Sequence, residues 1–153
     1  MTTILCDRVN GMLGADSFQE HNGGFAIYSG RKIECLPDGR FVAASGAEEM
    51  RLLWIEWLID GMHPKERPVL KDFTGLLLDK NHNLYRYDEA CIQQKINEPF
   101  YAIGSGCDWA MSAMACQKTL VEALRIACQY NAYSSLPIVV FKIGSGTPDI
   151  YFL

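Results

Sequence analysis

The chain has 153 residues, of which 49% are hydrophobic, and 14 Lys and Arg against 18 Asp and Glu give it a net charge of −4. This length and apolar share fit one domain, over residues 1–153, with a core of its own. No basic stripe is present, which excludes the usual electrostatic footprint of a nucleic-acid-binding protein. The apolar runs at residues 76–78 and 138–141 are too short to cross a bilayer, and no basic segment followed by an apolar one opens the chain. We therefore expect a cytoplasmic protein whose partners include neither nucleic acid nor a membrane.

The cysteines and histidines do not form a metal-binding pattern. None of the six cysteines belongs to a CxxC pair, and the three histidines lie far from any close cysteine pair. Zinc sites normally require such clustered ligands. In a reducing compartment we expect free thiols, most of them facing the core.

The first 44 residues predict strands and turns. Asn10-Gly11 is a hairpin signal, and Pro37-Asp38-Gly39 is a turn in which proline presets φ and glycine accepts a positive φ. The strands expected around these turns span residues 3–6, 12–16, 25–28, 32–36 and 41–44.

The spacing of the apolar residues then changes to that of a helix, which we expect from Ser45 to about residue 60. Ser45 and Glu48 have the spacing of a capping box, and Gly61 is a plausible stop. An apolar stripe recurs at helical spacing and indicates core or a subunit interface; it consists of Leu53, Trp54, Trp57 and Leu58.

The second half of the chain predicts a hairpin, a short strand, two helices and two closing strands. Thr119 and Glu122 have capping-box spacing, so a new helix is expected from Thr119 to about residue 130. The helix before it, from about residue 108, is rich in small residues and should pack closely on a neighbour. The expected strands span residues 73–78, 84–87, 101–103, 138–143 and 150–153. Helices grouped between blocks of strands indicate an α+β fold with antiparallel sheets.

The most informative feature is Thr2, which follows Met1. Aminopeptidases remove methionine before small residues, and a freed Thr2 would carry both a hydroxyl and an α-amine. The α-amine has an ordinary pKa of about 7.7–8.0, so it can act as a base near neutral pH. Threonine with its own N-terminal amine is a recognised pair of nucleophile and base.

Four stretches in order resemble the proteasome β subunit and, more closely, the bacterial HslV-type peptidase. Their order and approximate spacing match that family over nearly the whole chain. They are Thr2-Thr3-Ile4 with Asn10-Gly11 and Gly14-Ala15-Asp16; Arg31-Lys32-Ile33 with Val42-Ala43-Ala44-Ser45-Gly46; Ala102-Ile103-Gly104-Ser105-Gly106; and residues 122–127 running on to Asn131-Ala132-Tyr133-Ser134.

The resemblance assigns roles to individual residues. It makes Thr2 the nucleophile, Lys32 the cation that lowers the pKa of the nearby amine or hydroxyl, and Asp16 the carboxylate that holds this lysine. It makes the backbone N–H of Gly46 the oxyanion donor at a helix N-terminus.

Three further residues support the nucleophile in this resemblance. Ser105 matches the serine that hydrogen-bonds the terminal amine, and Asn131 and Ser134 keep a polar pair at a helix end. Asn131 stands where proteasomal subunits carry an aspartate. Residues 61–71 are too few for the family's second long helix.

The resemblance implies the four-layer αββα sandwich of N-terminal nucleophile hydrolases and the activity of a threonine endopeptidase. It implies amide hydrolysis through an acyl ester on Thr2, with no cofactor or metal. It further implies a homo-oligomeric ring that encloses a chamber, unfolded polypeptide as substrate and an ATP-dependent unfoldase as a partner. The residues that would line the P1 pocket fall near residues 20–21 and Ala44.

Two other functions remain open from the sequence. One is a catalytically inactive ring subunit with a scaffolding or inhibitory role. The other is an N-terminal nucleophile amidohydrolase that acts on a small amide as a monomer. Without the resemblance, Asp16 and Lys32 would be interpreted as an ordinary surface pair and Gly104-Ser105-Gly106 as a strand-to-helix turn without chemistry.

Overall fold

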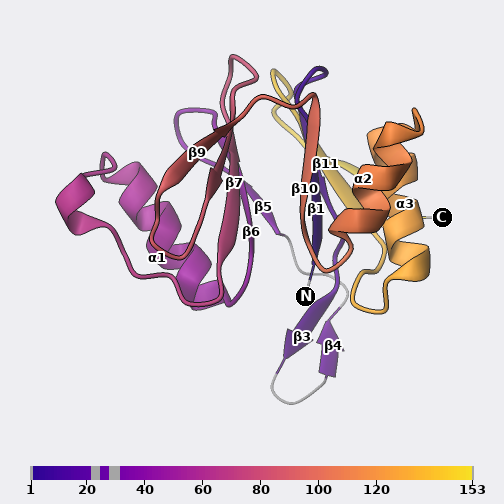
Figure 1. Ribbon diagram of the computed structural model, residues 1–153, viewed down its shortest axis with the longest axis horizontal. Coiled ribbons are helices and arrows are strands. Elements are labelled where there is room, and N and C mark those ends of the chain that lie inside the picture. The colour runs from indigo at the N-terminus through magenta and orange to yellow at the C-terminus, as the bar shows by residue number, and fades with distance from the viewer. Residues whose placement is uncertain (1, 22–24, 28–31, 153) are drawn as a thin grey trace.

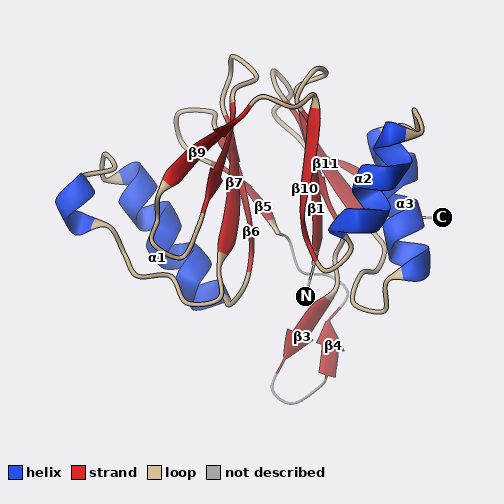
Figure 2. Ribbon diagram, in the orientation of Figure 1, coloured by secondary structure: helices blue, strands red, loops and turns tan. Residues whose placement is uncertain are grey.

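The chain folds into four layers in the computed structural model, which describes residues 2–21, 25–27 and 32–152. Two antiparallel five-stranded sheets lie face to face, with helices on their outer sides only (Figures 1 and 2). Met1, Arg31, Leu153 and the last residue of the strand expected at 25–28 lie outside the described residues. Among the described residues, no helix is long and apolar enough to span a membrane.

The first sheet carries the N-terminal strand at its interior. Its order is β10-β1-β2-β11-β12, so β1 is hydrogen-bonded on both edges. Its strands are β1 (Thr3–Asp7), β2 (Met12–Ala15), β10 (Phe100–Gly104), β11 (Ile138–Lys142) and β12 (Asp149–Tyr151). All five residues of β1 are buried, which fixes the start of the chain firmly within the fold.

The second sheet is a meander in chain order, β5-β6-β7-β8-β9. Its strands are β5 (Ile33–Cys35), β6 (Phe41–Ser45), β7 (Thr74–Leu78), β8 (Leu84–Tyr87) and β9 (Gln93–Ile96). A separate two-stranded ribbon joins β2 to β5 and consists of β3 (Gln19–His21) and β4 (Phe25–Ile27).

The helices cover opposite faces of the sandwich. Helix α1 (Glu48–Ile59) lies outside the second sheet, and α2 (Cys107–Ala115) and α3 (Leu120–Tyr130) lie side by side outside the first (Figure 1). A single 3-10 turn, η1 (Pro64–Glu66), follows α1. No long second helix is formed between α1 and β7, as the short segment there led us to expect.

Three apolar clusters fill the spaces between the four layers. The cluster between the sheets includes Ile4, Leu13 and Leu76, and the cluster under α1 includes Trp54 and Leu77. The third cluster packs α2 and α3 on the first sheet through small residues, as expected for the alanine-rich α2. Burial of these three clusters supplies the main driving force for this arrangement.

The elements in these layers confirm most of the predicted strands and helices, with three corrections. Ser45 belongs to β6 and does not cap α1, whose N-cap is Ala47 without a side-chain hydrogen bond. The short strands β3 and β9 were missed. Trp54 and Trp57 are 0% and 9% exposed, so they form core and offer no surface for an interface.

The six cysteines form no disulfide, and the expectation that most face the core is confirmed, since four of them belong to or pack against the apolar clusters. Cys6 and Cys91 are buried, Cys107 and Cys128 are half-buried, and the other two are exposed.

Candidate active site

The centre of the site is the carboxylate of Asp16, directly after β2. Its side chain is 0% exposed and accepts five hydrogen bonds. Oδ1 accepts from Thr2 Oγ1 at 3.3 Å, Thr3 N at 2.9 Å and Lys32 Nζ at 2.7 Å. Oδ2 accepts from the backbone N–H groups of Phe18 at 3.0 Å and Ser135 at 3.1 Å. Five donors around one buried carboxylate hold it in a single orientation.

Lys32, directly before β5, brings a positive charge from the opposite sheet to the start of β1. Its side chain is 7% exposed, so its ion pair with Asp16 is buried and is not the surface pair that the sequence left open. Burial lowers the pKa of Lys32 below its ordinary value, and the charge and hydrogen bond of Asp16 offset part of this effect. A lysine in this environment is a cation that gives up its proton more readily than an exposed one.

Two glycines allow the backbone of β10 and α2 to approach the start of β1. A Cβ at Gly104, where φ is +95°, would collide with the carbonyl oxygen of Thr2. A Cβ at Gly106 would collide with Oγ1 of Thr3. The Gly104-Ser105-Gly106 sequence therefore has a steric purpose here: it packs the β10–α2 turn directly on Thr2 and Thr3.

A second polar network lies on the other side of Thr2. Ser105 Oγ donates to the carbonyl oxygen of Thr2 at 3.3 Å and lies at the same distance from Asn131 Oδ1. Asn131, the C-cap residue of α3, also donates its amide to the carbonyl of Ser105 at 2.8 Å. Ser134 Oγ lies 3.4 Å from Asn131 Oδ1 and 2.6 Å from Thr3 Oγ1. The chain of contacts from α3 thus reaches the backbone of Thr2 and the side chain of Thr3.

Gly46 lies in the exposed turn between β6 and α1, with a φ of +131°. A Cβ there would lie 2.7 Å from the carbonyl oxygen of Asp72, so the position suits only glycine. Because α1 has Ala47 as its N-cap, the amide of Gly46 precedes the helix and is not one of its first-turn amides.

Six of the seven predicted residues are joined by the contacts of the two networks, and Gly46 lies apart from them in the turn after β6. Sequence reasoning missed Thr3 and Ser135, which tie the Asp16 carboxylate to the network from α3. The pair of adjacent threonines at the start of the sequence could have indicated a role for Thr3. Ser135 contributes only its backbone N–H, so its side chain gave no such indication. Side chains at residues 20–21 lie outside the described residues, so only Ala44 of the expected P1 pocket is placed, half-buried at the end of β6.

The arrangement suits nucleophilic chemistry by a hydroxyl. Thr2 Oγ1 and Lys32 Nζ share one acceptor atom, so a cation lies close to the hydroxyl that would have to lose its proton. Among the residues that the structure describes, no group of three histidine, cysteine or acidic side chains could hold a metal ion.

Two facing antiparallel five-stranded sheets with helices on their outer sides form the αββα sandwich of the proteasome-like fold.

Comparison with solved structures agrees with this class. The chain is similar to BPH of Thiobacillus denitrificans, a proteasome-homologous protein, solved in complex with epoxomicin: the TM-score is 0.66 at 20% identity, over 94% of this chain and 100% of that one. A second structure of the same BPH gives a TM-score of 0.62 at 18% identity, over 94% and 98% of the two chains. Neither the protein-family models nor the curated proteins gave a match. The likeness confirms the αββα fold expected from the sequence.

Proposed function

We propose that this chain is a threonine endopeptidase whose nucleophile is Thr2 after removal of Met1. The observation that carries this proposal is the shared oxygen Oδ1 of Asp16, which contacts the Thr2 hydroxyl at 3.3 Å and the Lys32 ammonium at 2.7 Å. A buried cation beside the hydroxyl lowers the cost of forming the alkoxide, which is the requirement for attack on an amide.

The reaction follows from the groups around Thr2. The Thr2 hydroxyl oxygen bonds to the substrate carbonyl carbon while its proton passes to the α-amine of the same residue. The N–H of Gly46 would donate to the oxyanion that forms. The C–N bond then breaks, and the departing amine receives the proton from the α-amine. Water attacks the ester on Thr2, and its hydrolysis restores the hydroxyl.

Ser105, Asn131 and Ser134 would hold the amine and the backbone of Thr2 in the geometry that this proton transfer needs. The support is their continuous set of contacts, from Asn131 at the end of α3 through Ser105 to the carbonyl of Thr2. The amide of Asn131 donates to the Ser105 carbonyl at 2.8 Å, a contact that a carboxylate could not make. An asparagine is therefore compatible with this network although proteasomal subunits carry an aspartate here.

The direct test compares Thr2→Ala with Thr2→Ser and with Thr147→Ala, an exposed threonine in the β11–β12 turn as a matched control. Thr2→Ala should abolish cleavage of unfolded peptides, while Thr2→Ser and Thr147→Ala keep activity, the former in part. Stability should change little in Thr2→Ala because Asp16 retains four other donors. Intact mass should show that Met1 has been lost from active protein. Activity in Thr2→Ala, or in protein that retains Met1, overturns the mechanism.

Epoxomicin, the ligand in the BPH structure, offers a second probe. As a peptide epoxyketone it has two electrophilic carbons, which a hydroxyl and an amine on one residue can both attack. A covalent adduct should form on the wild-type chain and be absent from Thr2→Ala. A chain without Met1 that forms no adduct and cleaves no peptide would instead support an inactive ring subunit.

We also propose that the chain assembles into a homo-oligomeric ring whose chamber admits unfolded polypeptide. The proteasome-like fold supports assembly, and large apolar side chains remain exposed on the outer helices, among them Leu52, Ile59, Trp109 and Tyr130. Trp54 and Trp57 are buried in the core and therefore give no support to a ring interface. Light scattering at micromolar concentration should give a mass several times 17.2 kDa. A monomer would contradict the ring and favour an amidohydrolase for small amides.

An ATP-dependent unfoldase would supply folded substrates to such a ring. The chain has no GxxxxGK[ST] sequence of its own, so it should cleave short peptides unaided and leave stable folded proteins intact. Degradation of a stable folded protein without nucleotide would contradict this dependence.

A further inference from the structure

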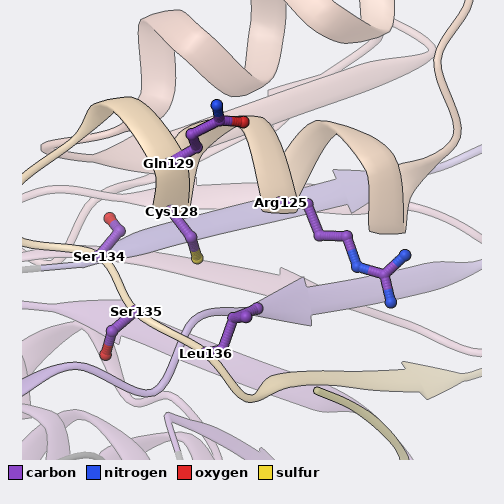
Figure 3. Close-up of a pocket in the computed structure, with 6 residues that line it drawn as sticks. All are labelled: Arg125, Cys128, Gln129, Ser134, Ser135 and Leu136. Atoms are coloured by element: carbon purple, nitrogen blue, oxygen red, sulfur yellow. The ribbon is translucent and has the colours of Figure 1, made fainter. Parts of the chain in front are cut away.

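A pocket of about 520 Å³ opens between helix α3 and the segment that follows it. Figure 3 shows Arg125, Cys128 and Gln129 on the helix and Ser134, Ser135 and Leu136 on the segment, with Cys128 pointing toward the segment and Gln129 pointing away from it. The volume falls within the range of about 300–1,000 Å³ that is usual for small-molecule sites. The pocket adjoins the Asp16 network through Ser135, whose backbone N–H donates to Asp16 Oδ2, and none of its lining residues is among those expected for the P1 pocket.

The chemistry of the lining favours an apolar body with one negative charge. Leu136 and the stem of Arg125 offer hydrocarbon, and Cys128 adds a thiol that remains neutral because burial raises its pKa to about 12. The guanidinium of Arg125 is exposed and forms no ion pair with any carboxylate in the described part of the chain. The carboxylate of Glu122, one turn earlier on α3, accepts a hydrogen bond from the backbone N–H of Thr119 at the helix start.

We propose that this pocket binds a small amphipathic carboxylate, with its apolar part against Cys128 and Leu136 and its carboxylate on Arg125. Charge complementarity selects the anion, since a planar guanidinium can donate two hydrogen bonds to a carboxylate. The same chemistry is offered by a free fatty acid and by the C-terminus of a short apolar peptide.

The pocket wall also reaches the candidate active site. Ser134 Oγ lies 2.6 Å from Thr3 Oγ1, and Ser135 N donates to Asp16 Oδ2 at 3.1 Å. A ligand that displaces this segment would therefore alter the support of Asp16 and Thr3. This consequence rests on the proposed function, whereas binding itself does not.

The experiment measures binding to the full chain by calorimetry. The probes are octanoate, octanamide, and acetyl-leucyl-leucine with a free or an amidated C-terminus. The variants are Arg125→Gln and, as a control away from the pocket, Lys118→Gln, also exposed.

At least one free acid should bind saturably, and its amide should bind about tenfold more weakly because the charged hydrogen bond is lost. Arg125→Gln should produce the same loss, and Lys118→Gln none. A preference for octanoate identifies the fatty acid as the source, and a preference for the dipeptide acid identifies the peptide terminus. Equal binding of acid and amide, an unchanged affinity in Arg125→Gln, or no saturable binding of either free acid overturns the proposal. Since none of these readouts uses catalysis, a chain without peptidase activity can still confirm it.

Discussion

Replacing Asp16 by asparagine should destabilise the fold strongly as well as remove activity. An amide offers one acceptor oxygen, whereas the carboxylate receives donors on both of its oxygens. Either the donors of Oδ1 or the two backbone N–H groups on Oδ2 would then face an NH₂ group. Each buried donor without an acceptor costs about 1–3 kcal/mol.

The loss of charge adds to the loss of acceptors, because Lys32 is buried beside Asp16. Breaking a buried ion pair by removing one partner costs about 3–5 kcal/mol. Lys32 can limit this cost by releasing its proton, so we expect a total of about 4–6 kcal/mol. In a chain of this size about 1 kcal/mol corresponds to a shift of about 2–4 °C, which predicts a fall in Tm of roughly 10–20 °C.

The assay is urea denaturation and thermal melting of Asp16→Asn beside Asp38→Asn. Asp38 pairs with Arg40 at 2.7 Å but is 54% exposed, so its substitution should cost under about 1 kcal/mol. The double variant Asp16→Asn/Lys32→Met should be more stable than Asp16→Asn, since it removes the buried charge without a partner. Equal stabilities of Asp16→Asn and Asp38→Asn, or no gain in the double variant, would refute the reasoning.

Three more predictions follow from the same geometry. Gly104→Ala should abolish activity and lower Tm, since its Cβ would collide with the backbone beside it, whereas Gly146→Ala, with open space around it, should do neither. Activity should fall as pH rises through the pKa of Lys32, which is lowered below the ordinary lysine value of about 10.4. In Lys32→Arg any loss of activity at alkaline pH should move to higher pH. A pH–rate profile measures both effects. Thr3→Val should cost about 1–3 kcal/mol in a urea titration, because the buried Ser134 hydroxyl loses its 2.6 Å contact with Thr3 and keeps only the 3.4 Å contact with Asn131, and Thr3→Ser should restore the loss.

The strands and helices were predictable where the sequence has a local mechanism. The capping box of Thr119 and Glu122 forms as expected, with both reciprocal hydrogen bonds, because it depends on residues three apart. The same spacing at Ser45 failed because Ser45 pairs with Thr74 on β7, and the sheet took precedence over the cap. Strand β9 was missed since three of its four residues are exposed and polar, which leaves no alternating pattern.

The site residues were predictable as a set only through the resemblance. Asp16 and Lys32 are brought together by the folding of one sheet onto the other, which no local rule describes. The part played by Thr3 and by the backbone of Ser135 depends on contacts across 131 and 119 residues of sequence. Such contacts follow from topology, so they become visible only when β1, β2 and the end of α3 are placed together.

The position of β1 supports the proposal that Thr2 is the nucleophile. Chain ends usually fray, because few contacts hold them. Here Thr3 pairs with Gly104 in the sheet, its N–H and carbonyl both bond Asp16, and its hydroxyl meets Ser134. Thr2, the residue before Thr3, is 4% exposed and is held in place by these neighbouring contacts. A hydroxyl and an amine on that residue would thus be held as firmly as groups in the middle of a sheet, which is what proton transfer between them requires.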